Sequence, residues 1–279
     1  MKIREILREA TAELENISDS PSLDARVLMC EALGVENIYI ITHQADELSS
    51  EAEGRFRKML SMRKESMPVA YIIGRKEFMS MDFYVDERVL IPRSDTETLV
   101  ERAISIIGGK KMRVLDMCCG SGCIGLSVKK YAGSISLTLA DISDGACEVT
   151  EINKEKYFPG NSDVEVVKSD LFENITGMYD MILSNPPYIS YEEMKTLSKD
   201  ILSYEPHLAL EADNEGLYYY ERIADECRGY LRTGGYIIFE IGWSQGEDVK
   251  KILEKNNFTE TEILKDLAGL DRVVLGKKK

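Results

Sequence analysis

The residues best suited to chemistry in this sequence form the stretch Asn185-Pro186-Pro187-Tyr188. It follows an apolar run over 179–184 that predicts a buried strand. Proline fixes the backbone and lacks an N–H donor, so the carbonyl oxygens of this stretch stay available as hydrogen-bond acceptors. A rigid group of acceptors at a strand end would suit a substrate that offers a planar NH2 group. A stiff loop that only caps the strand is the structural alternative.

A second polar turn, Asp116 to Gly122, begins at the end of an apolar run over 113–117. Its glycines would let the backbone approach a ligand closely. Together with Gly125 they also match the dinucleotide motif G-x-G-x-x-G, with Asp141 about 20 residues further on. Two features favour S-adenosylmethionine over NAD. Asp116 can face a cationic amino group but would repel a pyrophosphate, and a hydride-transfer enzyme has no evident use for the acceptor stretch.

Two further aspartates follow the next two predicted strands, Asp141 after 135–140 and Asp170 after 164–168. The Asp141 carboxylate could accept hydrogen bonds from both hydroxyl groups of a ribose. Asp170 is placed to meet an adenine amino group. Each carboxylate could instead cap a helix or lie in a solvated loop. Because polar groups recur at successive strand ends, we interpret them as parts of one site.

A sheet must position these residues, because strand and helix patterns alternate from about residue 113 onward. This alternation predicts an α/β fold with a mostly parallel sheet and helices on both of its faces. In such sheets, ligands bind beyond the carboxyl ends of the strands. The predicted strands are 113–117, 135–140, 164–168, 179–184, 236–241, 259–264 and 271–276, and the predicted helices are 124–131, 143–157, 216–231 and 245–255.

The N-terminal third of the chain is expected to form two other parts. Helical spacing of apolar residues predicts a helical bundle over 1–70, whose role would be to bind or orient a partner or simply to pack. Alternating bulky residues over 78–85 predict a β-hairpin within a linker over 71–93. Residues 94–279 would then form the catalytic domain, which starts with a helix capped by Ser94.

The composition is that of an ordinary globular protein, with a formal net charge of −14. This charge argues against broad binding to nucleic acid phosphates, although it leaves a local basic patch open. No apolar run approaches the roughly 18 residues of a membrane span, and the N-terminus lacks the apolar segment of a signal peptide. We therefore expect a cytoplasmic protein with no membrane contact and no direct nucleic acid contact.

The six cysteines lie in apolar stretches without a paired framework, so free thiols are expected. Cys118, Cys119 and Cys123 could suggest structural zinc, but their spacing is not C-x-x-C. The two histidines, His43 and His207, stand alone in the sequence. We therefore expect no metal site.

Over nearly its whole length the chain resembles the protein-(glutamine-N5) methyltransferases that modify peptide chain release factors, the HemK/PrmC family. Asn-Pro-Pro-Tyr alone is shared with adenine, cytosine and guanine amino-methyltransferases, so it indicates the chemistry and not the substrate. Two other segments, 68–74 and 90–97, are much more specific. The resemblance is carried by Pro68–Gly74 with Glu77-Phe78, Leu90–Glu97, Asp116–Gly122, Asn185–Tyr188, Glu205-Pro206 with Ala209-Leu210, and Glu240–Trp243 with Gln245-Gly246.

The resemblance implies a class I methyltransferase that uses S-adenosylmethionine and releases S-adenosylhomocysteine. Its fold would be a seven-stranded Rossmann-like sheet with an antiparallel last strand, preceded by a small N-terminal helical domain. The methyl group would go to the N5 amide nitrogen of the glutamine in the GGQ motif of peptide chain release factors, which affects translation termination. Release factors are therefore the expected partners, and the enzyme is expected to be a monomer.

The family pattern also implies site residues at the positions that match its motifs. With the aspartates above, the expected cofactor-binding residues are Asp116, Cys118, Cys119, Gly120, Ser121, Gly122, Asp141, Asp170, Leu171 and Asn185. The expected substrate-binding residues are Asn185, Pro186, Pro187 and Tyr188, of which Asn185, Pro186 and Tyr188 are also the expected catalytic residues. Cys118 departs from the pattern, because the family usually has a glycine there. Leu171 stands where some members carry an aromatic residue against the adenine.

The expected mechanism uses neutral acceptors. The Asn185 side-chain oxygen and the Pro186 carbonyl would accept the two N–H groups of the glutamine amide, and Tyr188 would pack along the amide plane. A ribosomal RNA or DNA amino-methyltransferase, acting on adenine N6 or guanine N2, is the alternative enzyme and would need a basic face. A binding module that retains only the fold is the alternative outside enzymes, and the intact Asp116, Asp141 and Asn185 argue against it.

Overall fold

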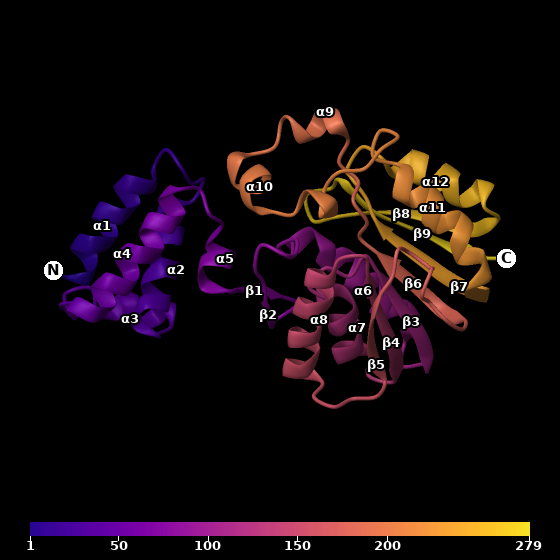
Figure 1. Ribbon diagram of the computed structural model, residues 1–279, viewed down its shortest axis with the longest axis horizontal. Helices are drawn as coiled ribbons and strands as arrows, with labels where there is room; N and C mark the ends of the chain where they lie inside the picture. Colours follow the sequence, from indigo (N-terminus) through magenta and orange to yellow (C-terminus); the bar gives the residue numbers. More distant parts are fainter. The chain divides into compact units, whose positions relative to one another are not determined.

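The computed structural model describes residues 1–279 and divides into two compact units. The helical unit comprises Met1–Arg75 together with Ser198–Tyr204. The sheet unit comprises Lys76–Leu197 together with Glu205–Lys279. Figure 1 labels the elements of both units along the chain. No helix combines the length and the apolar character that a membrane span requires.

The helical unit is a bundle whose first four helices bury apolar side chains. Its elements are α1 (Ile3–Leu14), α2 (Pro21–Leu33), α3 (Asn37–Thr42), α4 (Ser50–Lys64), α5 (Val69–Ile73) and α10 (Lys199–Tyr204). Fully buried side chains, among them Ile6, Leu14, Leu28 and Phe56, form its core. Proline at the first position of α2 has a backbone already suited to a helix start, and Gly34 ends that helix in the left-handed conformation, with φ 67°.

Two details of the chain differ from the sequence-based expectation. Residues 69–73 form α5, so the hairpin expected within 71–93 is confined to β1 (Arg75–Phe78) and β2 (Met81–Tyr84). In addition, α10 belongs to the helical unit although the chain reaches it only after residue 197. There the Tyr204 hydroxyl donates a hydrogen bond to the Glu65 carbonyl oxygen over 2.9 Å. Local patterns could not reveal this, because the contact joins segments far apart in the sequence.

The sheet unit is built on a seven-stranded sheet with the order β5-β4-β3-β6-β7-β9-β8. Its strands are β3 (Met112–Met117), β4 (Ile135–Asp141), β5 (Val164–Lys168), β6 (Tyr179–Ser184), β7 (Leu231–Glu240), β8 (Phe258–Lys265) and β9 (Asp271–Lys278). Neighbours from β5 to β7 pair in parallel, whereas β9 pairs antiparallel with both β7 and β8. The predicted α/β fold with an antiparallel last strand is thus confirmed.

The β7 strand begins earlier than expected, because the glycines at 234 and 235 lie within it and do not precede it. The pairing of β6 with β7 shifts register between Tyr179 and Met181, which accommodates the extra residues as a bulge. Glycine in a strand usually signals such a bulge or a close backbone approach. Here an added Cβ at Gly235 would lie 2.9 Å from the Asp180 carbonyl oxygen.

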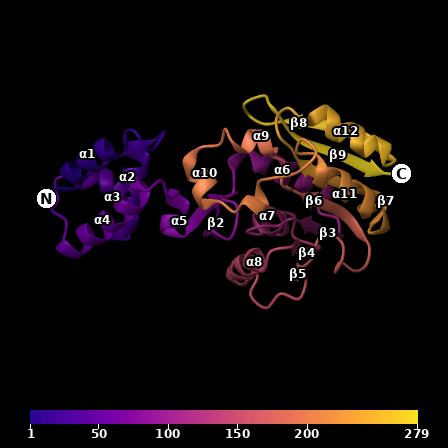
Figure 2. The same ribbon diagram turned by 45° about the horizontal axis from the view of Figure 1, so that its top comes forward.

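Alternating strand side chains pack against helices on opposite faces of the sheet. Val114 and Leu183 belong to the cluster with α6 (Glu97–Ile107) and α7 (Cys123–Ala132). Their sequence neighbours Leu115 and Ile182 belong to the cluster with α11 (Tyr218–Glu226) and α12 (Gly246–Lys255). Figure 2 shows the same elements from a second direction. The remaining elements are α8 (Asp144–Tyr157), α9 (Tyr191–Met194), and the 3-10 turns η1 (Ser94–Thr96), η2 (His207–Ala209) and η3 (Cys227–Gly229).

Candidate active site

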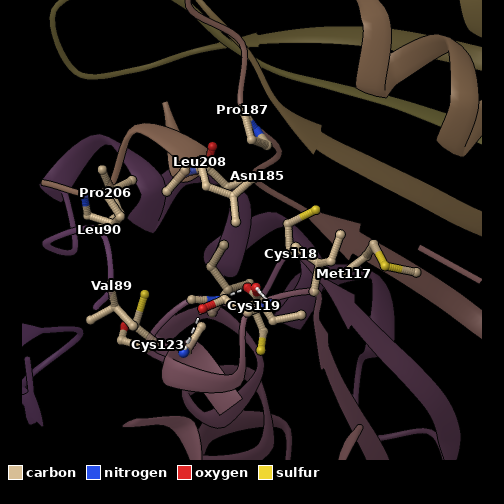
Figure 3. A pocket seen from close by; sticks show the side chains of 18 of the residues that line it. Val89, Leu90, Met117, Cys118, Cys119, Cys123, Asn185, Pro187, Pro206 and Leu208 are labelled. Atoms are coloured by element: carbon tan, nitrogen blue, oxygen red, sulfur yellow. Dashed lines mark hydrogen bonds between the residues drawn. The ribbon is translucent and has the colours of Figure 1, made fainter. Parts of the chain in front are cut away.

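A cavity lies at the carboxyl ends of the central parallel strands, where the predicted site residues converge (Figure 3). It holds about 1000 Å³ of empty space, part of it open to solvent. We call it the main cavity. Nine of the predicted site residues line it, namely Cys118, Cys119, Gly120, Ser121, Asp141, Asp170, Leu171, Asn185 and Pro187. The other four, Asp116, Gly122, Pro186 and Tyr188, do not.

The turn between β3 and α7 forms one wall of the main cavity and has an unusual backbone. Cys118, Gly120 and Gly122 all adopt positive φ, at 60°, 54° and 76°. This conformation suits glycine, whereas for Cys118 it carries steric strain. No atom lies within 4 Å of the position that a Cβ on Gly120 would take, so the backbone there is open to close approach.

Gly125, the third glycine of the motif, has a structural role. A Cβ at this position would lie 2.7 Å from the Leu139 side chain and 2.9 Å from an Asp116 carboxylate oxygen. Only glycine therefore allows α7 to pack this closely on β3 and β4. The close packing also brings the Gly125 N–H to the Asp116 carboxylate, over 2.8 Å.

Two polar side chains of α8 hold the turn in place, and sequence reasoning missed both. Thr150 donates to the Gly120 carbonyl oxygen over 2.8 Å, and Asn153 donates to the Ser121 carbonyl oxygen over 2.9 Å. Asn153 also exchanges two hydrogen bonds with the backbone of Tyr84 in β2. Both side chains are fully buried. Their spacing on the apolar face of α8 was the available signal, because a buried polar residue needs a partner.

Asp116 lies behind the turn. Its side chain is fully buried, and the oxygen that does not bind Gly125 has no hydrogen-bond partner. Burial raises the pKa of Asp116 to about 7. This placement makes Asp116 a support for the start of α7. Its contact with a cofactor amino group stays a prediction.

Asp141, at the end of β4, lines the main cavity, and its contact with a ribose stays a prediction. One carboxylate oxygen accepts the Gly120 N–H over 2.9 Å, and the other accepts the Ser143 N–H over 3.0 Å. Each oxygen keeps a second lone pair for a ligand hydroxyl group. The two backbone bonds therefore fix a carboxylate that can still accept hydrogen bonds from a diol.

The residues after β5 form a further part of the wall. Leu171 adopts a positive φ of 44° and is 4% exposed, so it offers a rigid apolar surface. The Ser169 hydroxyl donates to its carbonyl oxygen over 2.6 Å. Asp170 pairs with Arg222 of α11 over 3.2 Å, a partner that the sequence did not indicate. The Asp170 carboxylate is thus partly neutralised before any ligand binds.

The residues of the stretch after β6 border two different cavities. Asn185 and Pro187 line the main cavity, whereas Tyr188 borders a second cavity lined also by Lys76, Pro92, Arg93, Ser94, Asp95, Glu240 and Arg272. No hydrogen bond within the protein uses the Pro186 carbonyl oxygen, which leaves it available as an acceptor. The Ser184 hydroxyl donates to the Met117 carbonyl oxygen over 2.7 Å and ties the ends of β6 and β3 together. The side-chain amide of Gln245 donates to the Tyr188 carbonyl oxygen over 3.1 Å.

An ion pair between the half-exposed Arg93 and the buried Glu205 joins two segments of the cavity wall. Glu205 is 4% exposed, and its carboxylate accepts hydrogen bonds from Arg93, over 2.5 Å, and from the Ile91 N–H, over 3.3 Å. It thereby joins the segment 90–93 to the segment 206–209, and both segments contribute lining residues. Two of the segments that carry the family resemblance are therefore in direct contact.

The six cysteines are free, and three of them, Cys119, Cys123 and Cys227, are buried. Burial raises the pKa of Cys118 and Cys119 beside the main cavity, so both thiols stay protonated near neutral pH. These thiols are therefore poor nucleophiles. They contribute shape and apolar surface to the wall.

Comparisons with known proteins find relatives that match nearly the whole chain. The family model described as PrmC N-terminal domain matches residues 5–74, and the one described as methyltransferase small domain matches residues 95–213. A protein of Clostridium acetobutylicum named release factor glutamine methyltransferase is 37% identical over 99% of this chain and 98% of its own length. A protein of the same name from Fusobacterium nucleatum is 38% identical over 93% of this chain and 74% of its own length.

Solved structures agree on the fold. The hMettl16 catalytic domain, in complex with an RNA hairpin, superposes with a TM-score of 0.61 at 14% identity, covering 79% of this chain and 82% of its own. A methyltransferase from Pyrococcus furiosus superposes with a TM-score of 0.52 at 15% identity, covering 80% of this chain and 97% of its own. At such identities the likeness establishes the fold alone.

Proposed function

Since the chain belongs to the release factor glutamine methyltransferase family, we propose that it methylates a glutamine side chain of a peptide chain release factor. The acceptor would be the N5 amide nitrogen of the glutamine in the GGQ motif, and the methyl donor would be S-adenosylmethionine. The observation that carries the proposal is the placement of Asn185. Its amide borders the main cavity at the end of β6, between the β3 turn and the segment 206–209.

The residues around the main cavity fit S-adenosylmethionine. The open backbone at Gly120 and the carboxylate of Asp141 suit the ribose and the amino acid part, and Leu171 offers an apolar surface to the adenine. When bound, the cofactor supplies an electrophilic methyl group on a sulfonium centre. S-adenosylhomocysteine would be the product left in the same place.

The protein's task is to prepare a weak nucleophile. The nitrogen lone pair of an amide is delocalised into its carbonyl group, so the amide must be held in line and its developing positive charge must be stabilised. The Asn185 side-chain oxygen and the Pro186 carbonyl oxygen can accept the two N–H groups of the substrate amide. Both are neutral and fixed before reaction, and they bind more strongly as these hydrogens become more acidic in the transition state.

Tyr188 contributes packing and not proton transfer in this proposal. Burial raises its pKa above the ordinary value of a phenol, so its hydroxyl stays protonated at neutral pH. No strong base is needed, because the methylated amide nitrogen loses its proton readily. The Arg93–Glu205 ion pair joins two segments of the cavity wall and so helps to fix the shape of this region.

The helical unit is proposed to contribute to recognition of the protein substrate. Its short helix α3 exposes Ile38 by 63%, Ile41 by 49% and Tyr39 by 36%, so apolar side chains gather on one small element. Replacing Ile38 and Ile41 together by serine should raise KM for the release factor and leave kcat unchanged. An unchanged KM would remove α3 from the recognition surface. As predicted from the sequence, we propose a cytoplasmic monomer, which light scattering can test for oligomeric state.

The proposed function is tested by incubating the protein with methyl-labelled S-adenosylmethionine and a purified release factor. Peptide mapping should place the label on the GGQ glutamine, and a release factor with alanine at that glutamine should remain unlabelled. The same incubation with ribosomal RNA and with DNA addresses the alternative acceptors. Label in a nucleobase, with none in the release factor, would contradict the proposal.

A further inference from the structure

The carboxyl end of β7 places an acidic residue directly beside the acceptor residue of β6. Ser184 of β6 pairs in parallel with Phe239 of β7, so the next residues, Asn185 and Glu240, lie side by side. In a parallel sheet, residues in register project to the same side. On its other edge, Glu240 pairs with Val273 of β9. Asn185, just beyond β6, and Glu240, at the end of β7, are therefore neighbours at the carboxyl edge of the sheet.

Glu240 is an unexpected residue to bury. It is 2% exposed, and one of its carboxylate oxygens is buried without a hydrogen-bond partner. Burying a carboxylate costs free energy unless hydrogen bonds or opposite charges compensate. If this position only filled the core, an apolar residue would make the fold more stable. Burial raises the pKa of Glu240 to about 7, although the nearby side chains of Thr96 and Asn185 and the charge of Arg272 oppose this rise. The Asn185 side chain is thus one of the few polar groups near this carboxylate.

A hydrogen bond between these two side chains would decide which end of the Asn185 amide faces the substrate. An ionised carboxylate can only accept hydrogen bonds, whereas a side-chain amide has an accepting oxygen and a donating NH2 group. In such a bond the NH2 group of Asn185 turns toward Glu240 and the oxygen turns away from it. Asn185 lines the main cavity whereas Glu240 does not, so the oxygen is directed to the side from which a substrate amide arrives.

We propose that Glu240 is a positioning residue that holds the Asn185 amide with its oxygen toward the substrate. The negative charge behind the amide also polarises it, which makes its oxygen a better acceptor as positive charge develops on the substrate nitrogen. Glu240 touches neither the methyl donor nor the acceptor in this proposal, and it acts only through Asn185. The inference rests on the proposed function, in which Asn185 accepts an N–H group of glutamine.

The first measurement compares Glu240→Ala and Glu240→Gln with Asp266→Asn. Asp266 is a suitable control, because it is a buried carboxylate that binds Arg272, over 3.1 Å, and lines neither cavity. Glu240→Ala should lower kcat about 10- to 100-fold, the range that follows loss of an outer partner of a functional group. KM for the release factor and Kd for S-adenosylmethionine should stay within about threefold. Asp266→Asn should lower thermal stability and leave kcat near the wild-type value.

The pH profile separates positioning from packing. The other titratable or charged groups that influence Glu240 are Asp95, Arg272, Tyr188, Tyr220 and Cys123. Once protonated, the Glu240 carboxyl group could donate a hydrogen bond to the Asn185 side-chain oxygen. The Asn185 amide would then present its NH2 group, and not its oxygen, to the substrate. The wild-type kcat should therefore rise with pH through about 7 as Glu240 ionises. Glu240→Gln keeps a hydrogen-bond acceptor but carries no charge and does not titrate. Its kcat should therefore be lower than that of the wild type and should not rise with pH through about 7.

A last readout needs no substrate and separates this inference from the proposed function. The side-chain NH2 signals of Asn185, assigned by their loss in Asn185→Ala, should shift in Glu240→Ala and stay in place in Asp266→Asn. The inference is overturned if these signals do not shift in Glu240→Ala, if Glu240→Ala keeps the wild-type kcat, or if Asp266→Asn loses kcat equally. If no release factor is methylated by the wild type, the proposed function fails, and the NMR result alone decides the contact.

Discussion

The two halves of the sheet's carboxyl edge form their parts of the site in different ways. At β3, β4 and β5 the wall is mostly backbone, with positive φ at four positions and carboxylates held by N–H groups, as at Asp116 and Asp141. At β6, β7 and β9 the wall is formed by side chains, and the charged groups Glu240 and Arg272 line the second cavity with Tyr188. The first half gives the main cavity its shape, and the second half is proposed to polarise the Asn185 amide.

This difference teaches where a substitution should act. In the first half, a side chain matters mainly through the backbone that it fixes, so its loss should change affinity or stability. In the second half, a side chain matters through its acceptor oxygen or its charge, so its loss should change turnover. The following predictions test this division, in order of decreasing expected effect.

The largest effect is expected for Asn185→Ala in the second half. Loss of a preorganised polar group at a developing charge should lower kcat about 10³-fold. Kd for S-adenosylmethionine, measured by calorimetry, should change little, because the β3 turn and Asp141 remain. Methylation at the wild-type rate would contradict the proposed role of Asn185. An equally large loss of affinity for S-adenosylmethionine would show that the two halves do not differ in this way.

Asp116→Asn in the first half should change how stability depends on pH. The pKa of Asp116 rises from about 3.8 in the unfolded chain to about 7 in the folded one, so the folded state holds its proton more tightly. This carboxyl therefore stabilises the fold at low pH, and its contribution is lost as pH rises from about 4 through 7. Between pH 5 and pH 8, the wild type should lose about 2–3 kcal/mol relative to the variant. Chemical denaturation at both pH values measures the free energy of unfolding of each protein. The same change with pH in the wild type and the variant would contradict a proton held by Asp116 in the folded state.

Asp141→Ala should weaken cofactor binding with little direct effect on the chemical step. Hydrogen bonds to a charged group contribute about 1.5–3 kcal/mol, so Kd should rise about 10- to 100-fold. Asp144→Ala is the matched control, because Asp144 is an exposed neighbour that pairs with Lys168 and does not line the main cavity. Equal affinities for the two variants would reject the ribose contact.

The smallest effect is expected at Cys118, where a non-glycine residue adopts a φ of 60°. Cys118→Gly should relieve about 1 kcal/mol of backbone strain relative to Cys118→Ala, which keeps a Cβ in the same conformation. Thermal unfolding of the two variants measures this difference. Cofactor affinity should stay within about threefold of the wild type, since the backbone path is unchanged. A less stable glycine variant would show that the turn tolerates the Cβ without strain.

Much of the fold and of the first half could be predicted from the sequence, because its signals are local. Strands end on aspartates, and glycines mark the turn that includes Gly120 and Gly122. The supports were not predictable in the same way. Thr150 and Asn153 are ordinary polar residues of a helix until α8 lies beside the β3 turn. Glu240 ends a strand as Asp141 does, and only the register of β6 with β7 brings it beside Asn185.

The origin of α10 has a practical consequence for anyone who wishes to cut the protein into its parts. A fragment that stops at Arg75 would lack α10, and with it the Tyr204 hydroxyl that binds the Glu65 carbonyl oxygen. The complementary fragment would carry residues 198–204 without the bundle to which they belong. Neither the helical unit nor the sheet unit is therefore encoded by one continuous gene segment. A faithful dissection needs a circular rearrangement or a replacement linker across 198–204, not a single truncation.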